Sequence, residues 1–418
     1  MNRILLLTLC AIAGVALLSC QQMPPPQVAN ENKPAAASPE AARKSNAPDC
    51  KAVSNRVVSQ VAGVKEGDVV FISGGVRDME LLEDLVTDSR RVGAFPLLTI
   101  NSDRMAKRYF DEVPEKYDTQ PPDFALKLAT LPTVAISVDS NEIESNLADV
   151  SPTRLANTAR TSQPVGDLFQ KRNVKQVEIG NDLYPTEWRA KHFGISQDEL
   201  AKTFWAAVDT DYTGLQIAGD KIKTTLSTGK ELHITSPEGT DLKVKIEARP
   251  FFVSDGIISA DDVQKGGPLV AVYLPAGEVF TAPVAGTAEG KVSIAQQFYR
   301  GKEITNLTLV FTGGKMTSMT GTGPGFDAMK KDYDAVTDPG KDLFSYIDFG
   351  INPNLKIWPA SKVGNWVQAG MVSLGTGFNT WAGGDNKASF DAGGHLAGCT
   401  VTLDGNTIIE KGEWKPQQ

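Results

Sequence analysis

Glu278 is the residue of this sequence whose setting most invites a chemical role. An apolar run at 269–274 predicts a buried strand, and Pro275 and Gly277 then end that strand. A carboxylate at the end of a core strand is costly to bury alone, so Glu278 needs a cation, a hydrogen-bond network or solvent. Residue types alone favour a solvated turn glutamate and leave a ligating carboxylate as the alternative.

The stretch from Pro275 to Pro283 resembles the metal-binding signature of the aminopeptidase T family, which are metallo-aminopeptidases. It reads Pro-Ala-Gly-Glu-Val-Phe-Thr-Ala-Pro. The resemblance implies a two-metal site held by two Glu, two His and one Asp, with a Tyr nearby, and makes Glu278 one of the ligands. Two ions ~3.5–4 Å apart bind the substrate carbonyl and a bridging water in such sites. The resemblance extends over most of 51–414 and is strongest around Glu278.

The family's second Glu and first His fall on different residue types in this chain. Asp348, within Ile-Asp-Phe-Gly-Ile at 347–351, stands at the position of the second Glu. Ser373 stands at the position of the first His and is a poor metal ligand. The position of the family's Tyr falls within 378–381, which contains no tyrosine.

The family's last His and Asp also fall on changed residues. Asp391 and Gly393 take those two positions, and His395 lies close enough in sequence to serve instead of Asp391. The other two histidines, His192 and His233, carry no motif and are interpreted as structural or solvated. The resemblance therefore implies these candidate metal ligands: Glu278, Asp348, Asp391 and His395.

The altered ligand set leaves the cofactor and the activity open. Three carboxylates can share one hard cation such as Mg²⁺ or Ca²⁺, and a site without imidazoles favours such an ion over Zn²⁺. We therefore expect one or two divalent metal ions, with an empty site as the alternative. One hypothesis is a metal-dependent aminopeptidase with a modified site. The other is a non-catalytic binding or scaffolding protein on the same fold, which the missing imidazoles favour.

The charge of the chain excludes one class of partner. The 418 residues carry a formal net charge of −8, whereas nucleic-acid binding needs a basic face. The turn at 73–75, Ser-Gly-Gly, lacks the full spacing of a dinucleotide or P-loop fingerprint and is interpreted as a tight strand-to-helix turn. We expect no nucleic-acid partner, and we expect a peptide as substrate or ligand.

The N-terminus predicts a bacterial lipoprotein. Residues 1–19 combine Arg3 with a short apolar core, and Leu-Leu-Ser before Cys20 resembles a lipobox. Cys20 would then carry lipid, and residues 20–49, rich in Pro and Ala, would form a flexible tether. The alternative is an ordinary secretory signal. We expect a cell-envelope location, lipid-anchored in the membrane, with the outer membrane favoured because Gln21 is not a retention aspartate.

Two cysteines remain after the signal and the anchor. Cys50 and Cys399 lie near the two ends of the folded region. In an exported protein they could form a disulfide, or remain as two buried thiols.

Two domains are expected from the pattern of apolar residues. Strand-like runs separated by helical patterns predict an α/β domain with a mainly parallel sheet over 50–215. Alternating runs, such as the hairpin at 230–246, predict a mostly β domain of α+β type over 216–418. The family resemblance also implies a homodimer.

Overall fold

The first half of the molecule is organised around a parallel sheet, sheet A. The structure is a computed structural model that describes residues 48–356, 361–388 and 390–415. Sheet A has five strands in the order β2-β1-β3-β4-β8, and every pair is parallel. The strands are β1 (Val69–Gly75), β2 (Phe95–Asn101), β3 (Val134–Val138), β4 (Lys175–Ile179) and β8 (Ala271–Leu274).

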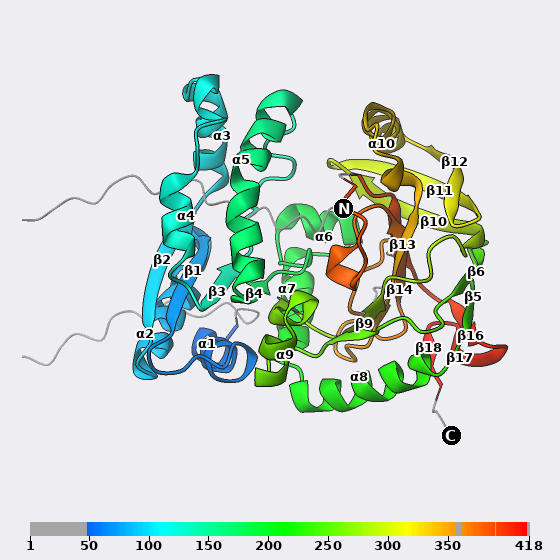
Figure 1. The fold of residues 1–418 in the computed structure, drawn as a ribbon, viewed down its shortest axis with the longest axis horizontal. Helices are drawn as coiled ribbons and strands as arrows, with labels where there is room; N and C mark the ends of the chain where they lie inside the picture. The colour runs from blue at the N-terminus through cyan, green and yellow to red at the C-terminus, as the bar shows by residue number, and fades with distance from the viewer. Residues whose placement is uncertain (1–47, 357–360, 389, 416–418) are drawn as a thin grey trace, which may run out of the picture.

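Helices cover both faces of sheet A, which is what buried parallel strands require. The helices of this half are α1 (Cys50–Arg56), α2 (Met79–Arg91), α3 (Asp103–Glu112), α4 (Asp123–Ala129), α5 (Pro152–Lys171), α6 (Glu187–Phe193) and α7 (Gln197–Val208). The next helix, α8 (Tyr212–Ser227), lies beneath the second half of the molecule (Figure 1). Leu82 and Leu85 of α2 are fully buried in the main core, together with Val70 and Ile72 of β1. A smaller apolar cluster lies beneath α4 and α5.

The strand β8 lies far along the chain, yet it completes sheet A. The chain leaves this sheet after β4, forms α6, α7 and α8, makes the β5–β6 hairpin and returns at β8. Residues 271–274 of the sequence-predicted C-terminal domain therefore pair with β4. Because of this return, residue 278 lies just beyond the carboxyl edge of the parallel sheet.

The second half is built from two antiparallel sheets. Sheet B has eight strands in the order β12-β11-β10-β6-β5-β16-β17-β18, and sheet C has five in the order β15-β14-β13-β9-β7. Sheet B contains β5 (Glu231–Thr235), β6 (Asp241–Lys245), β10 (Glu289–Tyr299), β11 (Lys302–Thr312), β12 (Lys315–Thr322), β16 (Thr400–Leu403), β17 (Asn406–Glu410) and β18 (Glu413–Trp414). Sheet C contains β7 (Phe252–Ser254), β9 (Glu278–Thr281), β13 (Phe344–Gly350), β14 (Val372–Thr376) and β15 (Gly393–Leu396).

The predicted fold class is confirmed. Figure 1 shows the α/β half in blue and cyan beside the β-rich half in yellow and red, with α6 and α7 between them. The hairpin expected at 230–246 is β5 paired antiparallel with β6. Two further helices, α9 (Ala260–Lys265) and α10 (Pro324–Ala335), belong to the β-rich half of the sequence. Within the described residues, no helix has the length and apolar character needed to cross a membrane.

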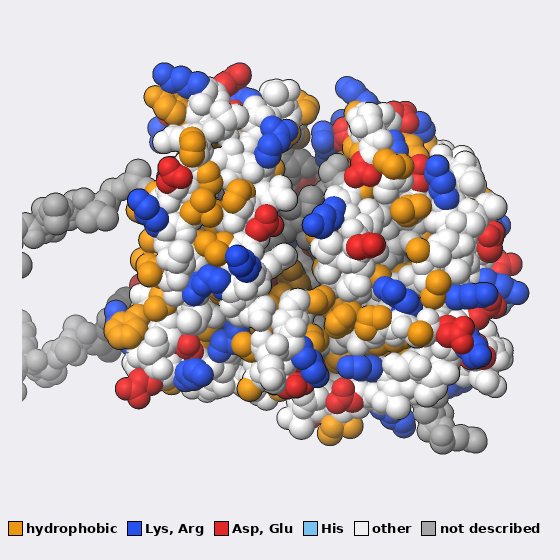
Figure 2. All heavy atoms as spheres, viewed as in Figure 1, with side chains coloured by type: hydrophobic (Ala, Val, Ile, Leu, Met, Phe, Trp, Pro, Cys, Tyr) orange, Lys and Arg blue, Asp and Glu red, His pale blue; other side chains and the backbone are white. Residues whose placement is uncertain are grey.

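An apolar surface lies at the outer edge of sheet A. Phe95 and Leu97 of the edge strand β2 are 56% and 39% exposed, and Phe124 of α4 is 56% exposed. Figure 2 shows apolar side chains gathered over this part of the molecule. Pro96 lies in the same edge strand and has no N–H to offer to a further strand, a feature that protects sheet edges from extension.

Candidate functional site

Strand register in sheet C brings four candidate positions onto one face. Asp348 of β13 lies opposite Ser373 of β14, and Ser373 lies opposite His395 of β15. On the other side of β13, Phe280 of β9 faces Asp348, and Glu278 lies two residues before Phe280 on the same side of its strand. Directly opposed residues of antiparallel strands point to the same side of the sheet. We call this side of sheet C the polar face.

The other side of sheet C is apolar and fixes this orientation. Its members alternate with those of the polar face and are fully buried: Val279, Ile347, Phe349, Val372 and Leu374. A shift of register by one residue would turn this apolar set to the polar side. Burial of the apolar side therefore keeps the candidate residues on their common face.

Ser373 takes the central place in the row of polar side chains. Its Oγ lies 2.8 Å from Nδ1 of His395, a hydrogen-bond distance. Ser373 and Asp348 are both fully buried, while His395 is half-buried. An imidazole at position 373 would have faced Asp348 directly, whereas the imidazole present in this chain lies one strand further away.

Glu278 lies at the junction of the two sheets. Its side chain is 1% exposed, and Nδ2 of Asn181 donates to its Oε1 over 3.4 Å. Asn181 belongs to the turn after β4, and it also donates to the carbonyl of Pro275 over 2.9 Å. Ser254 of β7 lies opposite Glu278 on the polar face. The solvated-turn interpretation of Glu278 is therefore wrong, because the carboxylate is buried among polar groups.

Sequence reasoning did not single out Asn181 or Ser254. Asn181 follows Gly180 directly after a strand, at the carboxyl edge where side chains of parallel sheets commonly meet ligands. That position is a signal that could have found it. Ser254 carries no such signal, because only the pairing of β7 with β9 places it beside Glu278.

Asp391 lies in the segment that leads into β15. It is half-buried, and burial raises the pKa of its carboxyl group. The charge of Asp182, in the turn after β4, raises this pKa further. Loops from both halves of the molecule thus approach each other at this end of sheet C.

Aromatic rings pack over the polar face. Trp381 lies 5.3 Å from Phe280 and 5.2 Å from Tyr346, measured between ring centroids. Trp366 lies 5.9 Å from Tyr346 and meets His395 edge-on at 4.7 Å. Trp381 falls in the segment expected to hold the assisting tyrosine of the family. These rings form a connected aromatic layer on the polar face.

The side chains present do not fit a five-ligand, two-metal centre. Among the described residues, no three His, Cys, Asp or Glu side chains are grouped so that they could hold one ion. Where the resemblance implied a His, the chain has the neutral hydroxyl of Ser373, and where it implied an Asp, Gly393 has no side chain that could bind an ion. We therefore assign no reaction step to a metal in this chain.

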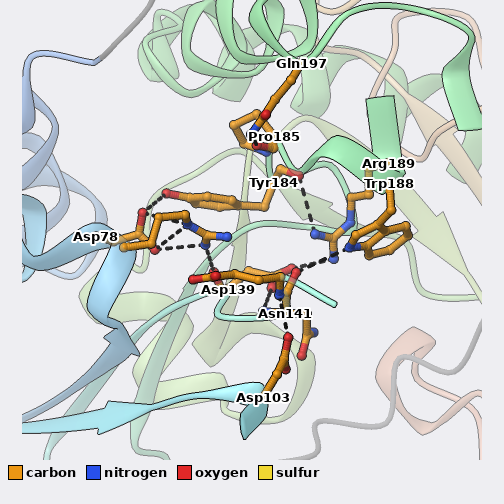
Figure 3. A network of polar contacts seen from close by, with 11 residues as sticks. Asp78, Asp103, Asp139, Asn141, Tyr184, Pro185, Trp188, Arg189 and Gln197 are labelled. Carbon is orange, nitrogen blue, oxygen red and sulfur yellow. Dashed lines mark hydrogen bonds and ion pairs between the residues drawn. The ribbon is translucent and has the colours of Figure 1, made fainter. Parts of the chain in front are cut away.

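A second polar network lies at the carboxyl edge of sheet A (Figure 3). Tyr184 donates to Oδ1 of Asp78 over 2.6 Å, and Arg77 binds the same carboxylate and the carbonyl of Asp139. Arg189 of α6 pairs with Oδ2 of Asp139 at 2.6 Å, with both side chains about 5% exposed. The network ties the loops after β1, β3 and β4 together. Its arginines pair with its aspartates, which is expected of a network that stabilises the fold.

The remaining predicted residues lie away from the polar face. His192 stacks on Phe298 at 3.5 Å between ring centroids, and His233 contacts Asp241 on β6. Cys50 begins α1 beside sheet A, whereas Cys399 lies before β16 in sheet B; both are buried, and no disulfide joins them. The two cysteines thus lie beside different sheets. Cys20 lies outside the described residues.

Comparison with known proteins gives the family and the fold. The model of a family described as thermophilic metalloprotease (M29) matches residues 49–332. Wild-type AmpT from Thermus thermophilus has a similar structure, with a TM-score of 0.69 and 16% identity over 88% of this chain and 99% of that one. No curated protein sequence matches this chain.

A second solved structure shows that the fold is not confined to peptidases. The 2,5-dihydroxypyridine dioxygenase from Pseudomonas putida KT2440 matches with a TM-score of 0.55 and 15% identity, over 90% of this chain and 99% of that one. At such identities the likeness concerns the fold alone, and fold does not fix chemistry. The family match covers Glu278 and ends before Asp348. With two thirds of its length matched and the expected resemblance confirmed, the chain belongs to the thermophilic metalloprotease (M29) family.

Proposed function

We propose that this chain is a cell-envelope lipoprotein that uses the M29 fold to bind peptides rather than to hydrolyse them with two metal ions. The observation that carries the proposal is the place of Ser373. It stands between Asp348 and His395 in strand register, and its hydroxyl is engaged with Nδ1 of His395. The position at which the family's imidazole would meet the second carboxylate is therefore occupied by a hydroxyl, which is a poor metal ligand.

Peptide binding follows from the groups that remain. Glu278 and Asp348 offer buried carboxylates that suit the ammonium group of a peptide N-terminus. The ring of Trp381, which is half-buried and packs against Phe280, offers surface for an apolar side chain. These are recognition features, and they need no activated water.

A direct test combines metal analysis, an aminopeptidase assay and a binding assay. We expect purified protein to contain no stoichiometric transition metal and to release no residue from aminoacyl p-nitroanilides, before or after incubation with Zn²⁺ or Mn²⁺. Tryptophan fluorescence should change on titration with short peptides that have a free N-terminus. Glu278→Gln, which removes one buried charge at nearly constant shape, should weaken that binding, and N-acetylated peptides are the matched ligand control.

The alternative is a peptidase with a modified, oxygen-rich metal centre. One observation favours it, because His395 returns an imidazole to the polar face from the neighbouring strand. Two bound ions that are lost in Glu278→Ala, together with hydrolysis, would establish this alternative and refute the binding proposal. Equal peptide affinity in the original protein and in Glu278→Gln would also contradict the binding proposal.

The envelope location rests on the sequence around Cys20. Lipid on Cys20 would hold the protein at the membrane, with the outer membrane as the expected site. Cys20→Ser should move the protein from the membrane fraction to the soluble fraction, and unchanged fractionation would refute the anchor. A homodimer remains part of the proposal through the family resemblance, and light scattering of the purified protein would test it.

A further inference from the structure

Tyr346 covers two glycines on the polar face. Gly375 of β14 lies opposite Tyr346 of β13 and opposite Gly393 of β15, so the three residues form one row across sheet C. A Cβ atom placed on Gly375 would lie 2.7 Å from the hydroxyl oxygen of Tyr346, and a Cβ atom on Gly393 would lie 2.8 Å from it. Both distances are shorter than real Cβ contacts. The phenol therefore extends over both glycines and fills the space above them.

The backbone around Gly393 closes the same space from a second side. A Cβ atom at Gly393 would collide with the carbonyl oxygen of Leu374, and one at Gly375 would lie 2.8 Å from the carbonyl oxygen of Ala392. Strands β14 and β15 thus approach each other closely where two glycines face each other. A side chain at 393 would need both this strand pair and Tyr346 to move.

Packing holds the phenol of Tyr346 in this position. Its side chain is 4% exposed and lies within ring contact of Trp366 and Trp381, whose own centroids are 6.1 Å apart. Moving Tyr346 aside would therefore disturb two indole rings as well. In a close-packed interior such a rearrangement is resisted by every neighbour.

We infer that Tyr346 occupies the volume of the carboxylate ligand that the family resemblance places at position 393. The phenol and the two indoles pack together over the two facing glycines. They fill the space in which the family's ligand would lie, so this part of the site is an aromatic core. This role of Tyr346 deepens the proposed function. It rests on that function only in taking Gly393 as the position of the family's aspartate. A side chain introduced at 393 alone would therefore meet both Tyr346 and the backbone of β14.

A double-mutant cycle tests this inference. Gly393→Ala should destabilise the protein, and the increase in the unfolding equilibrium constant should be about tenfold smaller in the Tyr346→Phe background, which removes only the hydroxyl that meets the new Cβ atom. Tyr346→Leu provides a second background without the phenol. Urea unfolding followed by circular dichroism gives the equilibrium constants.

Gly394→Ala is the matched control for the cycle. It lies on the same strand but meets Ile294 and Gln297 on the other side of the sheet, so its cost should be equal in all three backgrounds. An equal cost of Gly393→Ala with and without the hydroxyl would overturn the assignment of Tyr346. Metal bound by the original protein would refute the proposed function and leave this cycle unaffected, so the two failures are distinguishable.

Discussion

Replacing Asp255 with asparagine should stabilise the protein at neutral pH and have no such effect in mild acid. Asp255 directly follows β7, is 9% exposed and accepts a hydrogen bond from the backbone N–H of Ile257 over 2.8 Å. Burial raises the pKa of its carboxyl group to about 6, and the nearby charges of Asp262 and Asp220 act in the same direction. The native fold therefore holds this carboxylate in an unfavourable, charged form at neutral pH.

The sign and size of the effect follow from proton linkage. The ordinary pKa is 3.8, so between about pH 4 and pH 6 the folded state binds more protons at Asp255 than the unfolded state. Stability then falls as the pH rises through this window. Raising the pKa of Asp255 from 3.8 to about 6 corresponds to a loss of about 3 kcal/mol in the free energy of unfolding above pH 6. The amide of Asp255→Asn stays neutral and still accepts the hydrogen bond from Ile257. The substitution should therefore raise the free energy of unfolding by about 2–3 kcal/mol at pH 7.5.

Urea unfolding at pH 4 and at pH 7.5 provides the measurement. At pH 4 the acid is largely protonated in the folded state, so Asp255→Asn and the original protein should differ little. Asp327→Asn, which makes the same substitution at a solvent-exposed aspartate, is the matched control. If Asp255→Asn changed stability equally at both pH values, or lowered it at pH 7.5, the reasoning from burial would be refuted.

Three further outcomes follow from single contacts. Asp139→Ala should lower the free energy of unfolding in urea by about 3–5 kcal/mol, because it leaves the guanidinium of Arg189 buried without its carboxylate. A loss below about 1 kcal/mol would contradict a structural role for this network. Cys399 should resist iodoacetamide at pH 8 until urea is added, because burial raises its thiol pKa to about 12, and mass spectrometry detects the adduct. Ser373→Ala should cost about 1 kcal/mol through the lost hydrogen bond to His395, and no change would mean that this bond is not made in solution.

The position of Glu278 illustrates how far local sequence can lead. The strand before it, the break at Pro275 and the signature around it could all be recognised in the printed sequence. Whether the carboxylate was buried could not, because burial depends on Asn181 and Ser254, which approach from distant parts of the chain. Local residue types favoured a solvated turn, and packing between two sheets decided otherwise.

For the candidate ligands at 348 and 395, too, the sequence supplied the residue types and the structure decided their positions. The resemblance identified Asp348 as a replaced ligand and left Asp391 and His395 as alternatives near one position. Strand register placed His395 on the polar face beside Ser373, while Asp391 lies before the strand begins. Register is set by which apolar residues are buried across a whole sheet, so the spacing of a few residues cannot supply it.

The sequence by itself determined the parallel strands of the first half, the β-rich second half and membership in the M29 family, since these depend on short periodic patterns and one signature. Only the tertiary structure decided that β8 returns to sheet A, that Ser373 lies between Asp348 and His395, and that Tyr346 covers Gly393. Each of these features joins residues that are far apart along the chain or depends on the space left by neighbours. Such relations arise from packing of the complete fold, and no local pattern encodes them.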